Sequence, residues 1–524
     1  MPTHCIRHTE LPGTTRLFAD VLYHPEKSGR FYFHPYRDLN SYRESAAAID
    51  FSAERRAALV DAFRTMNPAG PSLERLAQPG TVAVATGQQV GLFSGPAYTV
   101  YKALHAARLA EWLTANGIPA VPVFWLATED HDFAEVNHAW VFDARHRASK
   151  LEMQRAVSGQ PVGRVTLVDP PLAELRAAMD GLPFAEEVVE LVAESYVPGA
   201  TMGQAFGGLV RRLLARFDIL QLDPLQPTFR ALAAPALRRA AESAHELTEA
   251  LMERGRELTA AGYHAQVHVG PQTSLVFLLE DGKRLTLRRK DDGYTAEGHH
   301  IGPAELAQRA ASLSPNALLR PVVQDSMIPT VASVMGPAET AYLAQSETLY
   351  RAILGRMPVV APRAGFTILD ARSQQKIERY GLSLADLFHG ENALRERIAG
   401  RLVPPELAAS LRQTAAEAET AVERMRAELT AFDPTLAKAA GLSARKIRHQ
   451  FAKIERKTGR EALRRDERAA VDAASLYGLI YPGRHLQERI YSILPFLAKH
   501  GLELIDRIYE SIQVDCPDHR LLVV

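Results

Sequence analysis

The stretch TVAVATGQQVGLFSGPAYTVYKALHAARLAEWLTANGIPAVPVFWLA, residues 81–127, decides the fold. It opens with a short β-branched apolar run that stops at Gly87, and after a loop it places Ala97, Tyr101 and Leu104 at helical spacing. Residues 118–127 (IPAVPVFWLA) then show no alternation of polar and apolar side chains, as in a parallel strand buried on both faces. The stretch therefore predicts a strand, a helix and a second parallel strand.

Three more segments extend this pattern along the chain. Residues 217–223 (FDILQLD), 329–336 (PTVASVMG) and 357–363 (MPVVAPR) each lie near a helical pattern. Alternating strands and helices predict an α/β fold with a doubly wound parallel sheet. We expect inserts at about 151–183, a strand pair with a helix, and at about 265–300, a β-hairpin or meander turning at the Asp-Gly of EDGKR. The first 51 residues show no clean period and indicate irregular packing or a lid.

The composition changes after residue 370, where strand signals stop and Ala, Arg, Glu and Leu dominate. We expect a core at 1–370, a helical arm at 371–480 and a segment at 481–524 that packs back on the core. The arm shows a coiled-coil seam with spacings of three and four, followed by a second helix at about 437–477. The seam residues are Leu407, Leu411, Ala415, Ala418, Val422, Met425 and Leu429. Two antiparallel helices are too narrow to bury this seam, so a homodimer is the natural expectation.

Charge and composition exclude several classes of protein. Lys and Arg number 61, as do Asp and Glu, so no global field recruits nucleic acid or an anionic membrane. No apolar run is long enough to span a membrane, and the start does not resemble a signal peptide. The only cysteines, Cys5 and Cys516, lie near opposite ends and form neither a metal-type pair nor a disulfide framework. We expect a cytoplasmic protein.

The loop after the first strand is a candidate phosphate site. Gly87, Gly91 and Gly95 would let the backbone approach an anion just before a helix start, with Ser94 between them. The spacing matches neither a P-loop nor G-x-G-x-x-G, and glycines that merely turn the chain explain it as well. Further candidates for ligand binding on this loop and helix are Gln88, Gln89, Tyr98 and Lys102. The lysine would neutralise a phosphate or, alternatively, extend into solvent.

The second strand ends in FWLATEDHDFAEVNH, residues 124–138, where an apolar run changes abruptly to Glu129, Asp130, His131 and Asp132. In open α/β sheets, ligands bind beyond the carboxyl ends of the strands, so these side chains are expected to line a site. If the chain continues as a helix, His131, Glu135 and His138 share a face that suits a metal or an acid/base pair. If it continues as a strand, that face is lost. We favour a polar ligand site without a protein-ligated metal.

A third cluster flanks the strand at 329–336. Arg320 and Gln324 precede it, and Gly336, Glu339 and Tyr342 follow it at a helix start, where a carboxylate complements the helix dipole. Capping is the alternative explanation.

Residues 441–470 hold ten Lys or Arg against four acids. Such a run is usually a solvated helix face, and RNA or nucleotide phosphate binding is the sharper alternative.

Five blocks of the chain, in order, resemble the bacillithiol biosynthesis protein BshC family. They are ATGQQVGLFSGPAYTVYKA (85–103), PVFWLATEDHDFAEVNH (122–138), GYHAQV (262–267), SPNALLRPVVQDSMIPTVASVMGPAETAYLAQ (314–345) and YPGRHLQERIYSILPFLAKHG (481–501). The resemblance implies a Rossmann-like core related to class I aminoacyl-tRNA synthetases and nucleotidyltransferases. It also implies connecting-peptide inserts and a C-terminal coiled coil that dimerises.

The resemblance implies a cysteine ligase that joins L-cysteine to glucosaminyl-malate through an amide, the last step of bacillithiol synthesis. A carboxylate is a poor electrophile, so activation by ATP, with Mg²⁺, is expected. Asp130 and Asp132 are then candidates for holding an ammonium group, His131 for the base, and Lys102 and Arg320 for holding carboxylate or phosphate. Two other hypotheses stay open: a nucleotide- or tRNA-binding protein without ligase activity, and a coiled-coil scaffold for the pathway enzymes.

Overall fold

The structure is a computed structural model that describes residues 4–154, 159–290 and 293–524. Parts of both expected inserts, residues 155–158 and 291–292, therefore lie outside the described residues. The chain forms two compact units. Unit 1 holds residues up to 144, 148–367 and 488–522, and unit 2 holds 145–147, 368–487 and 523–524. Each unit is described by itself below.

Unit 1 is built on a parallel sheet of five strands in the order β13-β12-β2-β3-β6. The strands are β2 (Val82–Gln89), β3 (Ala120–Ala127), β6 (Leu220–Leu222), β12 (Thr330–Met335) and β13 (Val359–Pro362). In chain order this is the 3-2-1-4-5 arrangement of a Rossmann-like sheet, with the strand order reversing between β2 and β12. All five strands lie in segments that were predicted as strands, and the doubly wound fold is confirmed.

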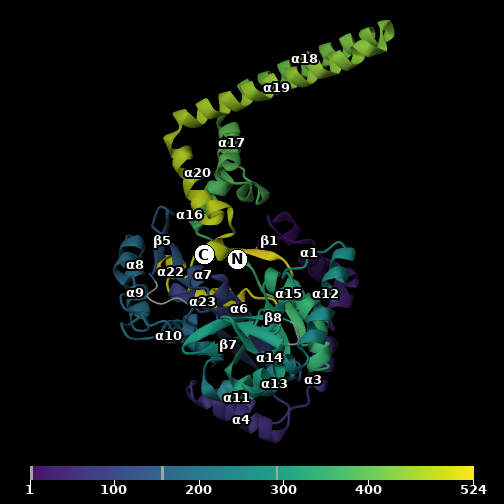
Figure 1. Ribbon diagram of the computed structural model, residues 1–524. Coiled ribbons are helices and arrows are strands. Elements are labelled where there is room, and N and C mark those ends of the chain that lie inside the picture. The colour runs from purple at the N-terminus through teal and green to yellow at the C-terminus, as the bar shows by residue number, and fades with distance from the viewer. Residues whose placement is uncertain (1–3, 155–158, 291–292) are drawn as a thin grey trace. The chain divides into compact units, whose positions relative to one another are not determined.

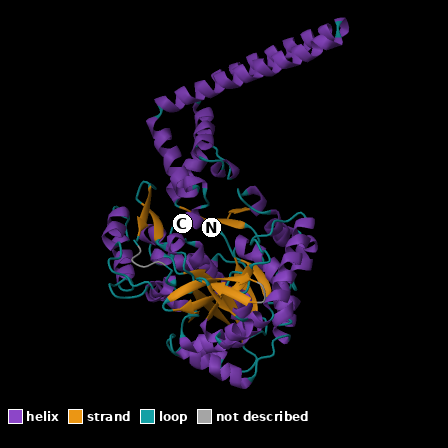
Figure 2. Ribbon diagram, viewed as in Figure 1, coloured by secondary structure: helices purple, strands orange, loops and turns teal. Residues whose placement is uncertain are grey.

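Helices cover both faces of this sheet (Figures 1 and 2). Ala83 and Ala85 of β2 face a core shared with α4 (Ala53–Arg64), α5 (Pro71–Leu76) and α11 (Pro227–Glu242). Val82 and Val84 face the opposite core, against α1 (Arg16–Tyr23), α3 (Leu39–Ala47) and α6 (Tyr98–Ala115). Because successive side chains of a strand point to opposite faces, burial on both sides requires the continuous apolar runs seen in the sequence.

The N-terminal segment is ordered secondary structure, so the expectation of an irregular segment or lid was wrong. It forms β1 (His4–Ile6), α1, α2 (Pro25–Ser28) and α3. Phe18 and Leu22 of α1 and Tyr42 of α3 are buried in the core below β2. Thr15 and Asp38 cap α1 and α3. Helices of eight and nine residues span barely two turns, which is too short for a period to emerge from a polar, aromatic-rich sequence.

The first insert begins earlier than predicted. Its strand pair is β4 (His138–Phe142) with β5 (Ala148–Glu152), and it is followed by α8 (Leu172–Ala178), α9 (Ala185–Ala193) and α10 (Met202–Leu213).

The second insert is an antiparallel sheet in the order β10-β9-β8-β7-β11. The predicted hairpin is confirmed: β7 (Thr273–Glu280) and β8 (Lys283–Lys290) meet at Asp281 and Gly282, with φ of 48° and 75°. The remaining strands are β9 (Gly293–Ala296), β10 (His299–Ile301) and β11 (Leu313–Pro315).

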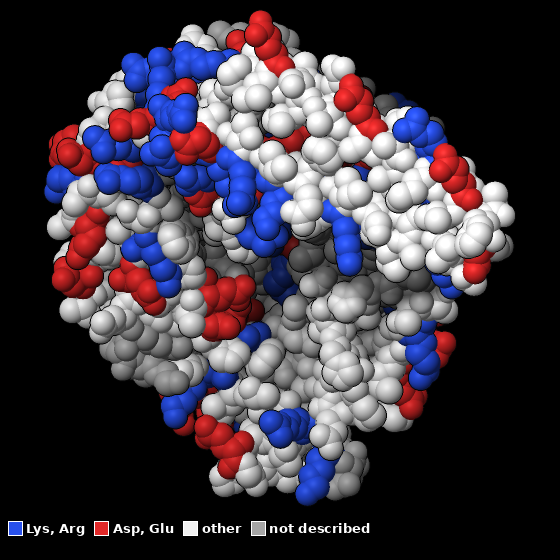
Figure 3. Space-filling model, turned by 90° about the horizontal axis from the view of Figure 1, so that it is seen from above, with Lys and Arg blue, Asp and Glu red and all other residues white. Residues whose placement is uncertain are grey.

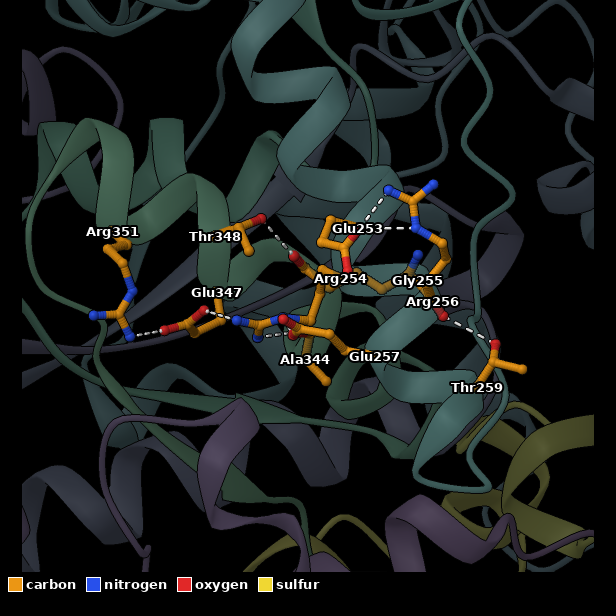
Figure 4. Close-up of polar contacts among 11 residues, drawn as sticks. Glu253, Arg254, Gly255, Arg256, Glu257, Thr259, Ala344, Glu347, Thr348 and Arg351 are labelled. Carbon is orange, nitrogen blue, oxygen red and sulfur yellow. Dashed lines mark hydrogen bonds and ion pairs between the residues drawn. The ribbon is translucent and has the colours of Figure 1, made fainter.

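A buried ion-pair network joins α12 (Ala244–Ala260) to α15 (Pro337–Ile353) (Figure 4). Arg254 donates to the Glu347 carboxylate at 2.6 Å and to the carbonyl of Ala344 at 3.2 Å. Arg351 also pairs with Glu347, which is almost completely buried. A buried carboxylate needs such partners, because removing one would leave an uncompensated charge. The network fixes the helix whose first turns enter the candidate site.

Unit 2 consists mainly of helices. They are α16 (Ala371–Arg379), α17 (Glu391–Leu402), α18 (Pro405–Phe432), α19 (Pro434–Arg465) and α20 (Glu467–Ile480). Helices α18 and α19 lie side by side and the chain reverses at Asp433, which caps α19. The predicted second helix at 437–477 is interrupted at Asp466, whose carboxylate accepts the N–H of Ala469 and starts α20. Polar capping residues are tolerated inside a helical pattern, so the sequence period did not reveal this break.

The basic run lies on exposed faces of α19 and α20, and several of its members pair with acids of the same unit. Arg464 and Arg465 pair with Glu461, and Arg460 pairs with Glu396. In the view of Figure 3, Lys and Arg side chains are interspersed with Asp and Glu. These pairs are what a solvated helix face presents.

Residues 488–522 return to unit 1 with α22 (Leu494–His500), α23 (Leu504–Glu510) and most of β15 (His519–Val523). Strand β15 pairs antiparallel with β1, in a three-stranded sheet of order β1-β15-β14, where β14 is Phe366–Leu369. The other helices are α7 (Phe133–Val136), α13 (Pro303–Gln308), α14 (Arg320–Met327) and α21 (Gln487–Ile490). Across the part of the chain that is described, every helix is too short or too polar to cross a membrane.

Candidate functional site

A cavity of about 850 Å³ opens at the carboxyl ends of β2, β3 and β12, where the strand order of the sheet reverses. This is where α/β sheets of this type bind ligands. Its walls bring together eleven residues singled out from the sequence: Gly87, Gln88, Gln89, Tyr98, Glu129, Asp130, His131, Asp132, Arg320, Glu339 and Tyr342. Three loops that are far apart in the sequence thus form one site.

One wall of the cavity carries carboxylates from the loop after β3. Asp130 accepts the backbone N–H groups of His131 and Asp132 at 2.7 and 3.2 Å, and the side-chain amide of Gln89 at 2.7 Å. Burial works to raise the pKa of Asp130, but these donors outweigh it and the pKa is lowered. Gln89 also donates to Glu135 at 2.9 Å. Asp130 is therefore held as a charged carboxylate facing the cavity.

Glu129 is the deepest carboxylate of this wall and is 7% exposed. Arg230 donates to its Oε1 at 3.1 Å, while the rest of that guanidinium bonds to the carbonyls of Ala311 and Leu313. Burial raises the pKa of Glu129 to about 7, against the opposing charges of Arg230 and Arg284. A carboxyl group that changes charge near neutral pH is suited to proton transfer.

His131 is fixed by Arg284, a residue of the inserted hairpin. The guanidinium donates to His131 Nδ1 at 3.1 Å and lies 3.7 Å from the ring centre of Phe277. Arginine has only donors, so Nδ1 must act as the acceptor in this contact. The proton of the neutral imidazole is then on Nε2. The hairpin thereby determines the tautomer of His131.

Lys102 lies behind the wall rather than in the cavity. Its side chain is 1% exposed, and Nζ pairs with Glu339 at 2.8 Å, with further bonds to Gln88 and the carbonyl of Gly87. The solvent-exposed alternative for Lys102 was therefore wrong. Burial works to raise the pKa of Glu339, but Lys102 and the N–H of Gly336 outweigh it and lower that pKa. Glu339 Oε2 accepts the Gly336 N–H at 2.7 Å, as in a capping box.

Guanidinium groups form another part of the cavity wall. Arg320 donates to Gln324 and to the hydroxyl of Tyr342, both at 3.2 Å, so Gln324 supports Arg320 from behind. Arg363 is paired with Glu488, and this pairing lowers the pKa of Glu488 to about 2 against the effect of burial. The charges of Arg320 and Arg489 are the ones in this wall that suit an anionic ligand group.

The glycine-rich loop places Gly91 and Gly95 beside a smaller pocket of about 120 Å³ next to the cavity. Ser94 is completely buried, with its hydroxyl 3.5 Å from that of Ser492, so it does not reach either space. Four backbone N–H groups here already have acceptors: Gly91 donates to Gln89, Phe93 to Tyr196, Gly95 to Leu92 and Ala97 to Tyr491. These donors do not fit a phosphate cradle. The φ of +64° at Gly95 instead serves the turn.

The arrangement around His138 does not support a three-residue metal face. Helix α7 is a single turn, and His138 already begins strand β4, so His131, Glu135 and His138 do not share a helix face. Among the described residues, no three His, Cys, Asp or Glu side chains are grouped as metal ligands. The polar-cluster interpretation of this loop fits the geometry better.

Sequence reasoning missed several residues of the cavity: Trp125, Phe277, Arg284, Asn316, Arg363 and Arg489. Arg363 follows β13 directly, so the rule that selected Asp130 could have found it. Asn316 and Arg489 lie inside the blocks that carry the family resemblance. No sequence pattern indicated that Arg284 lines the cavity, because it belongs to a hairpin whose packing against the sheet is a tertiary feature.

Comparison with known proteins agrees with this architecture. Residues 1–364 match the model of the bacillithiol biosynthesis BshC N-terminal Rossmann-like domain, and residues 366–524 match that of the BshC C-terminal coiled-coil domain. The chain belongs to the BshC family.

Full-length relatives support this membership. A protein of Solibacter usitatus named "Putative cysteine ligase BshC" is 64% identical over 99% of both chains. Proteins of the same name from Koribacter versatilis and Salinibacter ruber are 36% and 29% identical, over 99% and 100% of both chains. The recognition made from five sequence blocks is thus confirmed, including the Rossmann-like core and the coiled-coil domain of the BshC architecture.

Proposed function

We propose that this chain is a carbon–nitrogen ligase that joins the carboxyl group of L-cysteine to the amine of glucosaminyl-malate in the last step of bacillithiol synthesis. The observation that carries the proposal is that carboxylate and guanidinium groups line one cavity. Both substrates combine an amine with carboxylates, so they need anionic and cationic partners in one cavity. Membership of the BshC family and the relatives' name, cysteine ligase, support cysteine as one substrate.

The carboxylate wall suits the amino groups. Asp130 keeps its charge because its own hydrogen bonds lower its pKa, and Asp132 and Glu135 lie beside it on the same wall. We assign Asp130 and Asp132 to holding an ammonium group. The guanidinium groups suit the carboxylates of the substrates, which Arg320 and Arg489 would bind. Lys102 has a different part from the one expected: it is paired with Glu339 and supports the wall.

Formation of the amide requires the attacking amine to lose a proton. Glu129 is better placed than His131 to accept it, because Arg284 already donates to Nδ1 of His131 and leaves the ring proton on Nε2. The carboxyl group of Glu129 lines the cavity and has a pKa near neutral. We therefore assign proton acceptance to Glu129 and orientation of the reacting group to His131.

ATP, as its magnesium complex, would supply the activation that a free carboxylate lacks, by turning it into an anhydride with phosphate or adenylate. The guanidinium groups of Arg320 and Arg489 fit its anionic phosphates, whereas the glycine-rich loop does not. Side chains of this chain perform all of the proposed binding and proton-transfer roles.

We also propose a homodimer formed through unit 2. Four apolar side chains of α18 and α19 are 44–54% exposed: Leu407, Met425, Leu442 and Ile454. A second copy would bury them, as coiled-coil seams do.

Thiol profiling tests the ligase proposal. A strain lacking this gene should accumulate glucosaminyl-malate and contain no bacillithiol, and reintroduction of the gene should reverse both changes. A matched strain carrying Arg320→Gln should behave like the deletion, while Arg256→Gln, an exposed arginine of α12 outside the cavity, should behave like wild type. Normal bacillithiol in the deletion strain would refute the proposal.

A further inference from the structure

The two cysteines of the chain lie near opposite ends of the sequence, but both belong to unit 1, where the strands at the two chain ends pair. Cys5 is in β1, which pairs antiparallel with β15 so that Cys5 is directly opposite Arg520. Cys516 lies in the turn that leads into β15, with its N–H donating to the carbonyl of Gln513 at 3.3 Å. Strand pairing of β1 with β15 thus brings together two cysteines that lie near opposite ends of the sequence.

The side chains of Cys5 and Cys516 are close enough for the Cys516 thiol to affect the pKa of Cys5. Partial burial raises the pKa of Cys5, and the charge and hydrogen bond of the Cys516 thiol raise it further, while Arg520 opposes the shift. Cys5 is exposed and Cys516 is partly exposed, so small molecules can reach the pair. Both cysteines are free thiols in the structure.

A second contact holds the two segments together near the thiols. The hydroxyl of Tyr23 donates to Asp518 at 2.8 Å and accepts the backbone N–H of His8 at 2.8 Å. One side chain therefore bridges the residues just after Cys5 to those just after Cys516. This bridge and the register of β1 with β15 together bring the two thiols near each other. Neither the Tyr23 hydrogen bonds nor the strand pairing involves a thiol group.

We propose that Cys5 and Cys516 form a reversible intramolecular disulfide by exchange with a low-molecular-weight disulfide. The Cys5 thiolate attacks one sulfur of the small disulfide, forms a mixed disulfide and releases one small thiolate. The Cys516 thiolate then attacks the Cys5 sulfur and releases the second. The protein loses two hydrogen atoms and two electrons, and the small disulfide is reduced to two thiols.

This bond would tie the three-residue strand β1 covalently to the end of the chain. Because the closed loop contains nearly the whole protein, the bond restricts the unfolded chain strongly, and the oxidised form is expected to melt at a higher temperature. Since attack requires the thiolate and the pKa of Cys5 is raised, exchange should accelerate as the pH increases from 7 to 9. Neither expectation rests on the proposed ligase function.

Mass spectrometry of the full chain with oxidised glutathione as the probe tests the proposal. Wild type should become two hydrogen atoms lighter, lose both iodoacetamide-reactive thiols, give a cross-linked peptide that contains both cysteines, and revert with dithiothreitol. Cys5→Ser and Cys516→Ser should each stop at a single glutathione adduct. A wild-type protein that also stops at glutathione adducts, or that forms only intermolecular cross-links, would overturn the proposal.

Discussion

Replacement of Glu129 by glutamine should change how the stability of unit 1 depends on pH. In the folded protein burial raises the pKa of Glu129 from 4.5 to about 7. Between these values the unfolded chain loses the proton and the folded chain keeps it, so stability falls as the pH increases. Each pH unit of this interval is worth about 1.4 kcal/mol, which gives about 3 kcal/mol between pH 4.5 and pH 7. Glutamine cannot ionise, so the variant lacks this loss.

The assay is urea unfolding followed by tryptophan fluorescence at pH values from 4.5 to 8. Trp112, Trp125 and Trp140 are the only tryptophans and all belong to unit 1, so the signal reports on that unit. The quantity of interest is the free energy of unfolding of wild type minus that of Glu129→Gln. It should decrease by about 3 kcal/mol over this range. Asp132→Asn is the matched control, because it removes a carboxylate from the same wall at an exposed position.

A difference that stays constant with pH would refute the reasoning, since Glu129 would then have the same pKa in both states. A difference that increases with pH would refute it more strongly. It would mean that the ion pair with Arg230 outweighs burial and holds Glu129 charged, and the assignment of Glu129 as proton acceptor would fail with it.

Four further expectations follow from the same contacts. Lys102→Met should lower the free energy of unfolding by about 3 kcal/mol by leaving the Glu339 carboxylate without its cation, and adding Glu339→Gln should recover most of this loss in urea unfolding. Asp130→Asn should keep the free energy of unfolding within about 1 kcal/mol of wild type yet abolish bacillithiol in a complemented deletion strain, and full complementation would contradict its assigned role. Met425→Glu should convert a dimer to a monomer in light scattering at micromolar concentration, whereas an unchanged mass would exclude this seam. Gly95→Val should lower the free energy of unfolding by about 1–2 kcal/mol because Gly95 has a positive φ, and it should leave the ATP affinity in calorimetry unchanged. A folded variant with lost ATP affinity would show instead that this loop binds the phosphate.

The sequence was sufficient for the parts of the fold that depend on local pattern. Strand β3 is an unbroken apolar run, and β2 and β12 are mostly small or β-branched residues, so these strands could be predicted. The turn at Asp281 and Gly282 could also be predicted, because it uses residues that tolerate positive φ. The cavity wall after β3 could also be placed, because ligands bind at strand ends. Parts that depend on tertiary contacts could not be predicted: the position of Arg284, the burial of Lys102 and the meeting of Cys5 with Cys516.

The case of Lys102 shows why residue type alone misassigns roles in such a site. A lysine on the first turns of a helix that follows a glycine-rich loop has the position expected of a residue that binds phosphate. In the structure, however, its charge is paired with Glu339 of another helix. Arg363 is used in the same way by Glu488.

The charges of Lys102, which lies behind the cavity wall, and of Arg363, which lines the cavity, are thus neutralised by the protein itself. The anion-binding capacity of the cavity then rests on Arg320 and Arg489, and its cation-binding capacity on the wall after β3. The ligand that suits this combination must carry both positive and negative groups. A dipolar amino acid beside an aminosugar dicarboxylate meets that requirement, and a purely anionic ligand such as an RNA backbone does not.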